Sequence, residues 1–395
     1  MRTDPGTIGA ALAELDATAR RRQRRVIERY PAPGDGTRVL VDGRPLRVFC
    51  SNDYLGLAQH PEVVAALQAA SAQFGAGSGA AHLVTGHSTP HHQLEAELAA
   101  FTGRERALLF STGYMANLGV LTSFAGRGEA ILEDRLNHAS LIDGARLSGA
   151  RLLRYRHADA SHAALVLADR ANCAVIATDG LFSMDGDVAP LRELAALATR
   201  HRAWLMVDDA HGLGVLGASG RGALEQAGLD ARAVPLLVGT LGKAFGCFGA
   251  FVAGDEAVIE LLLQRARTYT FTTALPPGVA AAASAALRLA QRESWRREQL
   301  EARIAQFRAG ATALKLPLTG STSPIQPLIA GDSARALRLS RALYEQGFWV
   351  AAIRPATVPA GSARLRLTLS STHSAADVNE LLAALARAWQ LEPAP

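Results

Sequence analysis

The sequence predicts an α/β protein, with a large domain that holds a mostly parallel sheet between helices and a smaller α+β domain toward the C-terminus. Three observations predict this fold class. Short apolar segments alternate with helical patterns between about residues 105 and 255. Most of these segments end in glycine or a polar residue, and beyond about residue 290 the order of helices and strands changes. Alternation of strand and helix is typical of a parallel sheet covered by helices on both faces.

The composition indicates a soluble globular enzyme, because 49% of the 395 residues are apolar and 19% are charged. The net charge of +5 is spread along the chain, which argues against a nucleic-acid partner and suits an acidic small molecule or carrier protein. Cys50, Cys173 and Cys247 are far apart, so neither a disulfide scaffold nor a zinc ribbon is expected. The sequence has no apolar run of about 18 residues and no apolar signal core, so we expect a cytoplasmic protein without a membrane partner.

Residues 1–48 are predicted to form a helix and a strand that join the C-terminal domain. In the stretch around "TARRRQRRVIERY", acidic residues interleave with the arginines, and Leu12, Leu15, Val26 and Ile27 have partly helical spacing. This pattern favours an amphipathic helix over a transit peptide or a basic tail.

Residues 49–289 are predicted to form the large domain, in which "SNDYLGLAQHPEVVAALQAA" indicates a loop and then a helix. The expected strands are "ALLFSTG", "EAILED", "CAVIATDG", "AWLMVDDAHG", "PLLVGTLGK" and "GAFVAG", and "DVAPLRELAALATRHR" is an expected helix. Ligands of such sheets bind beyond the carboxyl ends of the strands. The polar residues at those ends are Ser111, Thr112, Gly113, Asp134, Asp179, Asp208 and Lys243.

Residues 290–395 are predicted to form the small domain, after an alanine-rich helix at about 277–291. The expected order is a helix in "ESWRREQLEARIAQFRAGATAL", a strand in "TSPIQPLIAG" and a helix with a strand in "SARALRLSRALYEQGFWV". "RLRLTLS" alternates like a half-buried strand, and "SAADVNELLAALARAWQ" is the closing helix.

One lysine stands among glycines in "GTLGKAFGCFGA", from Gly239 to Ala250. A surface turn is one interpretation. A phosphate-binding loop is excluded, because Gly239 and Gly242 are too close together and Ala244 follows the lysine. The third interpretation is that Lys243 forms a Schiff base in a pocket where glycines let a flat cofactor approach the backbone.

Two other motifs have weaker chemical interpretations. "HGLGVLG" contains the glycine spacing of a dinucleotide-binding loop, but the loop continues through "ASGRGALEQ", so an NAD site is not favoured. His82, His87, His91 and His92 cluster in "AHLVTGHSTPHHQLE". Without a companion cysteine or H-E-x-x-H spacing, a polar loop before a helix capped by Ser or Thr is favoured over a metal site, and no metal is expected.

The stretch "VDDAHG" follows an apolar strand and carries Asp208 and His211 at the ligand edge of the sheet. Either aspartate could instead cap the next helix. A pyridine-type cofactor needs an anion at its ring nitrogen and a donor at its phenolic oxygen, and Lys243 follows His211 at the end of a later strand. Gly113 and Tyr114 in "STGYMAN" could bind a phosphate at a helix N-terminus. His138 in "LNHASL" is either a loop histidine or a ring that stacks on the cofactor.

The ordered motifs "SNDYLGL", "STGYMANLG", "LNHASLIDG", "FSMDGD", "VDDAHG", "GTLGKAFG" and "IRPATVPAGSARLRLTLS" resemble those of the α-oxoamine synthases over nearly the whole chain. That resemblance implies a fold-type I transferase that uses pyridoxal 5'-phosphate (PLP), and a homodimer with shared active sites. It implies that Lys243 forms the Schiff base with PLP, that Asp208 pairs with the ring nitrogen and that His138 stacks on the ring. The other implied cofactor contacts are Gly113, Tyr114, Ser183, His211, Thr240 and, in the partner subunit's site, Thr272 or Thr273.

The resemblance also implies the substrate contacts Arg25, His138, Arg354, Thr357 and Arg366, with Arg366 holding the amino-acid carboxylate. The implied reaction is the decarboxylative condensation of L-alanine with pimeloyl-CoA or a pimeloyl carrier protein, in biotin biosynthesis. The alternative is another reaction of this family, such as the condensation of glycine with acetyl-CoA. Ala356 stands where the family motif usually has a second proline, which affects the expected placement of Arg354.

Overall fold

The computed structural model describes residues 5–32, 34–168 and 172–392. The chain forms two compact units, each described here by itself. Unit 1 comprises Met1–Ser51, Met184–Gly186 and Gln299–Pro395, and unit 2 comprises Asn52–Ser183 and Asp187–Glu298. The domain limits at residues 48 and 289 stay a prediction.

Unit 2 is built on a seven-stranded sheet with the order β3-β9-β8-β7-β6-β4-β5. Only β9 runs antiparallel to its neighbours among the described strands, so the predicted mostly parallel sheet is confirmed. All six strands expected from the sequence are present, and β5 is an additional one. The strands are β3 Arg106–Phe110, β4 Ala130–Asp134, β5 Arg151–Tyr155, β6 Cys173–Asp179, β7 Trp204–Asp208, β8 Leu236–Thr240 and β9 Ala250–Gly254.

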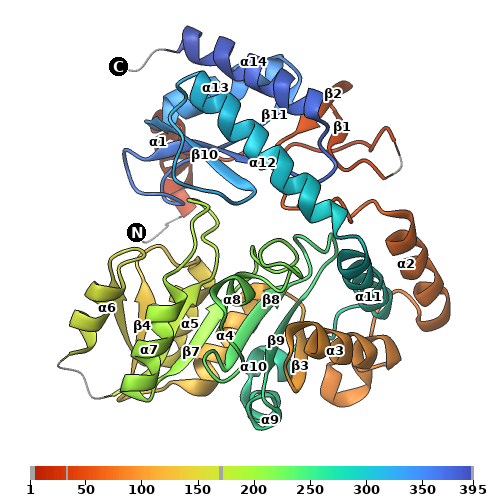
Figure 1. Ribbon diagram of the computed structural model, residues 1–395, viewed down its shortest axis with the longest axis vertical. Helices are drawn as coiled ribbons and strands as arrows, with labels where there is room; N and C mark the ends of the chain where they lie inside the picture. The colour runs from red at the N-terminus through yellow and green to blue at the C-terminus, as the bar shows by residue number, and fades with distance from the viewer. Residues whose placement is uncertain (1–4, 33, 169–171, 393–395) are drawn as a thin grey trace. The chain divides into compact units, whose positions relative to one another are not determined.

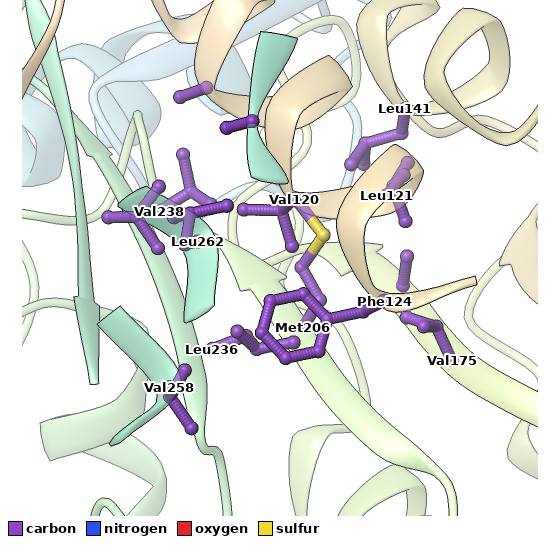
Figure 2. Close-up of a cluster of buried hydrophobic side chains, with 14 of the residues drawn as sticks. Val120, Leu121, Phe124, Leu141, Val175, Met206, Leu236, Val238, Val258 and Leu262 are labelled. Atoms are coloured by element: carbon purple, nitrogen blue, oxygen red, sulfur yellow. The ribbon is translucent and has the colours of Figure 1, made fainter. Parts of the chain in front are cut away.

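The helices of unit 2 cover both faces of this sheet (Figure 1). On one face, Val120, Phe124 and Leu141 pack on strand residues such as Met206 and Val238 (Figure 2). A second cluster on the other face joins the helix that carries Leu194 to other strand side chains. The helices are α2 Pro61–Phe74, η2 His82–Gly86, α3 Thr89–Thr102, α4 Gly113–Phe124, α5 Ala139–Ser148, α6 Ala160–Leu167, α7 Leu191–His201, α8 Ala223–Ala227, α9 Glu256–Arg265, α10 Arg267–Thr270 and α11 Pro277–Arg292.

Burial of both faces accounts for the apolar strand sequences, and the polar residues are left for the strand ends. Asp134, Asp179 and Asp208 are the last residues of β4, β6 and β7. Asp179 and Asp208 are direct neighbours in the parallel pairing of β6 with β7. The sheet therefore brings carboxylates together at one edge, as the sequence predicts.

Unit 1 contains two three-stranded sheets, with the orders β1-β2-β11 and β10-β13-β12. The strand β13, expected to be half-buried, is buried along its whole length, because it is the central strand of its sheet. The elements are α1 Ile8–Ala17, β1 Arg38–Val41, β2 Arg44–Val48, β10 Ile325–Gly331, α13 Ser333–Glu345, β11 Phe348–Trp349, β12 Ala351–Ile353, β13 Ala363–Thr368 and α14 Ala375–Leu391, while α12, Trp295–Ala313, begins in unit 2.

The predicted amphipathic helix through the arginine-rich stretch is wrong. The helix α1 ends at Ala17, has no buried residue, and is followed by Ala19 with a φ of 52°. Arg22 and Arg25 contact side chains of unit 1 that are far away in sequence, and the carbonyls of Ala19 and Arg21 accept from Arg354. The Arg22 guanidinium donates to the hydroxyl of Thr357, and the Arg25 guanidinium lies 3.7 Å from the centre of the Tyr344 ring. These tertiary contacts replace the helical hydrogen bonds that the local spacing favours.

The three cysteines are free thiols. Cys173 is buried in β6, and burial raises the pKa of this thiol to about 11. Among the described residues, we find no helix with the length and apolar character needed to span a membrane.

Candidate active site

Asp208 lies at the carboxyl edge of the sheet, is only 5% exposed, and is held by hydrogen bonds. The side-chain amide of Asn117 donates to one of its carboxylate oxygens over 2.6 Å, and the backbone N–H of Ala210 donates to the other over 3.0 Å. These bonds orient the carboxylate at the end of β7. A charge-assisted hydrogen bond of this kind is about twice as strong as a neutral one.

Asn117 connects Asp208 to His138. The same amide nitrogen lies 2.8 Å from the Ser140 hydroxyl oxygen, which lies 2.7 Å from Nδ1 of His138. The backbone N–H of His138 donates to the carboxylate of Asp179 over 2.7 Å. His138 is therefore fixed as the N-cap of α5, while the residue stays exposed. An exposed ring with an anchored backbone is suited to stack on a flat ligand.

His211 is held by a residue that precedes it by 157 positions. Its Nδ1 lies 2.7 Å from the hydroxyl of Tyr54, and both side chains are buried. Tyr54 belongs to the "SNDYLGL" motif, so this contact explains part of that motif. The contact between Tyr54 and Nδ1 fixes the orientation of the His211 ring. The direction in which Nε2 points is therefore fixed as well.

Lys243 lies in a tight loop between β8 and β9. Leu241 donates its N–H to the carbonyl of Gly249, and Gly246 donates its N–H to the carbonyl of Lys243. Gly246 has a φ of 64°, and a Cβ at this position would collide with the backbone of Ala58. The glycines of the loop therefore allow close packing that holds the half-buried lysine in place.

The charge of Lys243 affects several groups at this edge. Burial raises the pKa of Asp179 well above its usual value, with Asp208 acting in the same direction and Lys243 opposing it. Desolvation lowers the pKa of His138, while the nearby Asp208 carboxylate acts against that change and Lys243 adds to it. Lys243, Asp208, Asp179 and His138 thus form one interacting group. Clusters of groups with perturbed pKa values are characteristic of catalytic sites.

Asp209, next to Asp208, has a structural role. It is fully buried and accepts a hydrogen bond from the N–H of Ala223 over 2.7 Å. Burial raises the pKa of its carboxyl to about 8. A Cβ at Gly212 would collide with this carboxylate, so that glycine of the "HGLGVLG" motif serves packing in a loop, and no helix begins there as a dinucleotide site requires.

The N-terminus of α4 offers free hydrogen-bond donors near the sheet. The Thr112 hydroxyl caps this helix by accepting from the N–H of Met115. The first N–H groups of a helix have no partner within the helix and attract anions. Gly113 and Tyr114 provide two of these groups, as the sequence predicts for a phosphate.

The remaining predicted cofactor contacts follow strands or helices of unit 2. Thr240 is the last residue of β8, and its hydroxyl donates to the carbonyl of Gly249. Thr272 and Thr273 follow α10, and the carbonyl of Thr273 accepts from the hydroxyl of Ser111 over 3.5 Å. Ser183 is the last residue of the first segment of unit 2.

The donor set of unit 2 fits PLP. A half-buried lysine, a carboxylate fixed by two donors, an oriented histidine and a helix N-terminus match the aldehyde, the ring nitrogen, the phenolic oxygen and the phosphate of that cofactor. All of these groups lie in unit 2, at or beyond the strand ends that the sequence singles out.

Apart from His138, the predicted substrate contacts lie in unit 1. The Arg354 guanidinium donates to the backbone carbonyls of Ala19 and Arg21, and burial together with Arg22 lowers its pKa. Arg22, Arg354 and Thr357 are among the residues that line a cavity of about 240 Å³. Arg366 is buried in β13. Arg25, the arginine favoured from the sequence, lies instead over the rings of Tyr344 and Trp349.

Comparison with known families agrees with this fold. The family model "Aminotransferase class I and II" matches residues 45–385. The chain therefore belongs to the aminotransferase class I and II family. Within that family it is similar to proteins named 8-amino-7-oxononanoate synthase, which confirms the relationship predicted from the sequence motifs.

The similarity to these relatives extends over almost the full chain. The sequence is 60% identical to 8-amino-7-oxononanoate synthase of Methylococcus capsulatus, over 98% of this chain and 99% of the relative. It is 58% identical to the Pseudomonas putida protein of the same name, over 98% of each chain.

Solved structures with the same fold include a serine palmitoyltransferase from S. paucimobilis with a bound PLP–myriocin compound. It has a TM-score of 0.93 and 31% identity, and the match covers 99% of each chain. The 8-amino-7-oxononanoate synthase of Francisella tularensis matches with a TM-score of 0.77 and 32% identity, over 88% of this chain and 98% of that one. The predicted fold-type I architecture is thus confirmed.

Sequence reasoning missed four residues that hold the site together, namely Tyr54, Asn117, Ser140 and Asp179 in its bond to His138. Tyr54, Asn117 and Ser140 lie inside the motifs "SNDYLGL", "STGYMAN" and "LNHASL". The sequence did show that each of these three polar residues lies inside a candidate motif. Only the fold shows which polar groups their side chains form hydrogen bonds with.

Proposed function

We propose that this protein is a PLP-dependent acyltransferase that condenses L-alanine with a pimeloyl thioester, giving 8-amino-7-oxononanoate, CO₂ and a free thiol in biotin biosynthesis. The observation that carries the proposal is the group formed by Lys243, Asp208 and His138 at the carboxyl edge of the sheet. Identity of 60% to a relative named for this product supports the choice within the family.

The cofactor is held by residues of unit 2. Lys243 would bind its aldehyde carbon, and Asp208 would pair with the ring nitrogen and keep it protonated. His211 would donate to the phenolic oxygen, and His138 would stack on the ring. Gly113, Tyr114 and Thr240 would bind the phosphate, and Ser183 would lie beside the cofactor. Thr272 or Thr273 would reach the phosphate in the partner subunit's site.

When bound, PLP withdraws electrons from the α-carbon of the amino acid. The amine of Lys243 would take the α-proton as a general base and later return a proton to the product. Asp208 keeps the positive charge on the ring nitrogen that this chemistry requires. Asn117 and the N–H of Ala210 hold Asp208 in place for that role.

Substrate recognition falls to arginines of unit 1. Arg366 binds the carboxylate of alanine. Arg354, Thr357 and Arg22 bind the distal carboxylate of the pimeloyl group, because two neighbouring guanidinium groups beside a cavity favour an anion. Arg25, which has an aromatic partner, is a weaker candidate than Arg22 for that contact.

Thiol release tests this function directly. PLP-loaded protein receives alanine, glycine or serine, each with pimeloyl-, acetyl-, succinyl- or palmitoyl-CoA. We expect thiol release with alanine and pimeloyl-CoA, and mass spectrometry then identifies 8-amino-7-oxononanoate. Release with glycine and acetyl-CoA alone would contradict the substrate assignment and keep the site. No release with any of these pairs, nor with alanine and a pimeloyl carrier protein, would contradict the enzymatic function.

We also propose that the protein is a homodimer whose subunits share their active sites. We further propose that it is located in the cytoplasm. The three free thiols are compatible with a reducing compartment. Light scattering on the PLP-loaded protein tests the dimer, for which twice the chain mass of 41.6 kDa is expected. A monomer at micromolar concentration with full activity would contradict shared sites.

A further inference from the structure

A group of metal-binding side chains lies in unit 2 around the start of α3. His87, His92 and Glu95 each offer a ligand atom, and these atoms lie within 4.8 Å of one another. His92 and Glu95 are three positions apart on one helix, so they face the same side, and His87 comes from the turn before that helix. None of these residues has a role in the proposed reaction.

The three side chains line a cavity of about 370 Å³, together with Tyr269 and Arg106. Nε2 of His87 lies 4.0 Å from a carboxylate oxygen of Glu95. Two ligand atoms on one ion, at about 2.0–2.1 Å from it, lie about 3–3.5 Å apart. A shift of less than 1 Å therefore brings this pair onto a common ion, and the cavity leaves space for water or another ligand.

Neighbouring residues orient the ligands in the way that metal sites require. The second oxygen of Glu95 accepts the backbone N–H of Leu109 over 3.0 Å. Nδ1 of His87 lies 3.0 Å from Nδ1 of His82. A proton on Nδ1 of His87 that is donated to His82 leaves Nε2 as the free ligand atom, which is the arrangement found around metal-bound histidines.

The alternative group His82, His87 and His91 also has the required spacing, but His91 is already committed. Its Nδ1 accepts the N–H of Ser88 in the cap of α3, and its Nε2 lies 2.6 Å from the carbonyl of Leu275. A metal on His91 would break one of these buried contacts. The group with Glu95 needs no such change, and it adds a carboxylate that offsets the charge of the ion.

We propose that His87, His92 and Glu95 form a binding site for one divalent transition-metal ion of the zinc class. Two imidazole nitrogens and one carboxylate are a common ligand set for Zn²⁺, and imidazole disfavours Mg²⁺ and Ca²⁺. In this site the ion links the turn at His87 to α3. It lies beside Tyr269, in the helix that leads to Thr272.

The test uses the untagged, PLP-loaded protein after chelator treatment. Isothermal titration with ZnCl₂ is expected to show one tight binding site per chain. Metal analysis after gel filtration is expected to give the same ratio of zinc to protein. His92→Gln and Glu95→Gln are each expected to weaken this binding about tenfold or more, since each removes one of three ligands. His92 is exposed, and glutamine at position 95 keeps an acceptor for Leu109, so both variants are expected to fold.

His60→Gln and His201→Gln are the controls. His60 belongs to another group with suitable spacing, with Glu62 and Glu293, and His201 lies in the last turn of α7. Both controls are expected to keep the tight site. Absence of tight Zn²⁺ binding in the wild type would overturn the proposal. So would unchanged binding in His92→Gln and Glu95→Gln, or loss of the site in His60→Gln. Thiol release measured in the same samples is independent of this outcome.

Discussion

Asn117 is an uncharged residue that links two of the candidate site residues. It is 1% exposed, and its single amide nitrogen contacts both Asp208 and Ser140, which in turn contacts His138. The carboxylate below the proposed cofactor ring and the imidazole proposed to stack on that ring are therefore linked through one side chain. Displacement of Asn117 changes the positions of both.

Asn117→Ala is expected to lower kcat for thiol release about 10- to 100-fold, because a hydrogen bond to a charged group contributes about 1.5–3 kcal/mol. The KM for the thioester is expected to change little. Steady-state kinetics and the rate of α-proton exchange in alanine measure the effect. Ser123→Ala is the matched control, since Ser123 is also buried in α4 but its hydroxyl bonds only to the carbonyl of Gly119 among the contacts described. An unchanged exchange rate in folded Asn117→Ala would refute this role.

At the scale of elements, the loop between β8 and β9 illustrates how glycine positions the lysine. Gly246→Ala introduces a Cβ that collides with the backbone of Ala58 at a φ of 64°. We expect a loss of about 2–4 kcal/mol in the free energy of unfolding, with weaker PLP binding. Urea unfolding and cofactor titration measure these quantities.

Gly128→Ala provides the comparison for this loop. Gly128 has a φ of 90°, but nothing lies within 4 Å of a Cβ there, so only the backbone strain of about 1–2 kcal/mol is expected. Equal losses in the two variants would show that the contact with Ala58 does not matter.

The arginine-rich segment after α1 is a second element with a proposed function, in substrate binding. Arg22→Gln is expected to raise the KM for pimeloyl-CoA about tenfold or more, because it removes a charged partner of a carboxylate beside Arg354. The KM for alanine is expected to stay the same. Arg25→Gln is expected to have a smaller effect on either KM, since its guanidinium packs on Tyr344. A larger effect from Arg25→Gln would restore the assignment favoured by the sequence.

The elements that sequence reasoning predicted are those with strong local patterns. The six apolar strands of the large sheet and helices such as α7 and α14 have clear hydrophobic periodicity or capping residues. The strand β5, "RLLRY", is an outer strand in which Arg151 and Arg154 are exposed, so its apolar signal is weak. The stretch after Ala17 has helical spacing but binds distant residues, and a local pattern contains no information about such contacts.

At the scale of the whole molecule, several buried carboxyls affect stability. Glu133 is fully buried in β4, and neither of its carboxylate oxygens has a hydrogen-bond partner among the described residues. Burial raises the pKa of Glu133 to about 8. Between its ordinary pKa and this value, the folded state holds a proton that the unfolded state has lost. Stability therefore falls as the pH rises through this range.

Glu133→Gln is expected to reduce the fall in unfolding free energy between pH 6.5 and 8, by an amount on the order of 1–2 kcal/mol. Asp209 contributes to the same fall, because its pKa is about 8, so part of the slope is expected to remain. Urea unfolding of the PLP-loaded protein at the two pH values measures the slope. Glu301→Gln, at an exposed position, serves as control. An identical slope in wild type and Glu133→Gln would contradict a proton on buried Glu133.

The candidate site could be predicted in its chemistry but only partly in its geometry. Lys243, Asp208 and His211 stand out because each follows an apolar strand, and the parallel sheet brings such positions to one edge. Arg22 could not be distinguished from Arg25, since both lie in one run of arginines and only tertiary contacts separate them. The fold also assembles His87, His92 and Glu95, whose sequence spacing matches no common metal motif.

The central claim is that Lys243 carries the cofactor, and the sequence makes a direct test possible. The chain contains two lysines, Lys243 and Lys315, and Lys315 is exposed beyond α12. Borohydride reduction of the PLP-loaded protein makes the bond between lysine and cofactor permanent, and peptide mass mapping then locates it. We predict a pyridoxyl group on the peptide with Lys243 and its absence from Lys315. Modification of Lys315 alone, or an unmodified Lys243 in protein that contains PLP, would contradict the account.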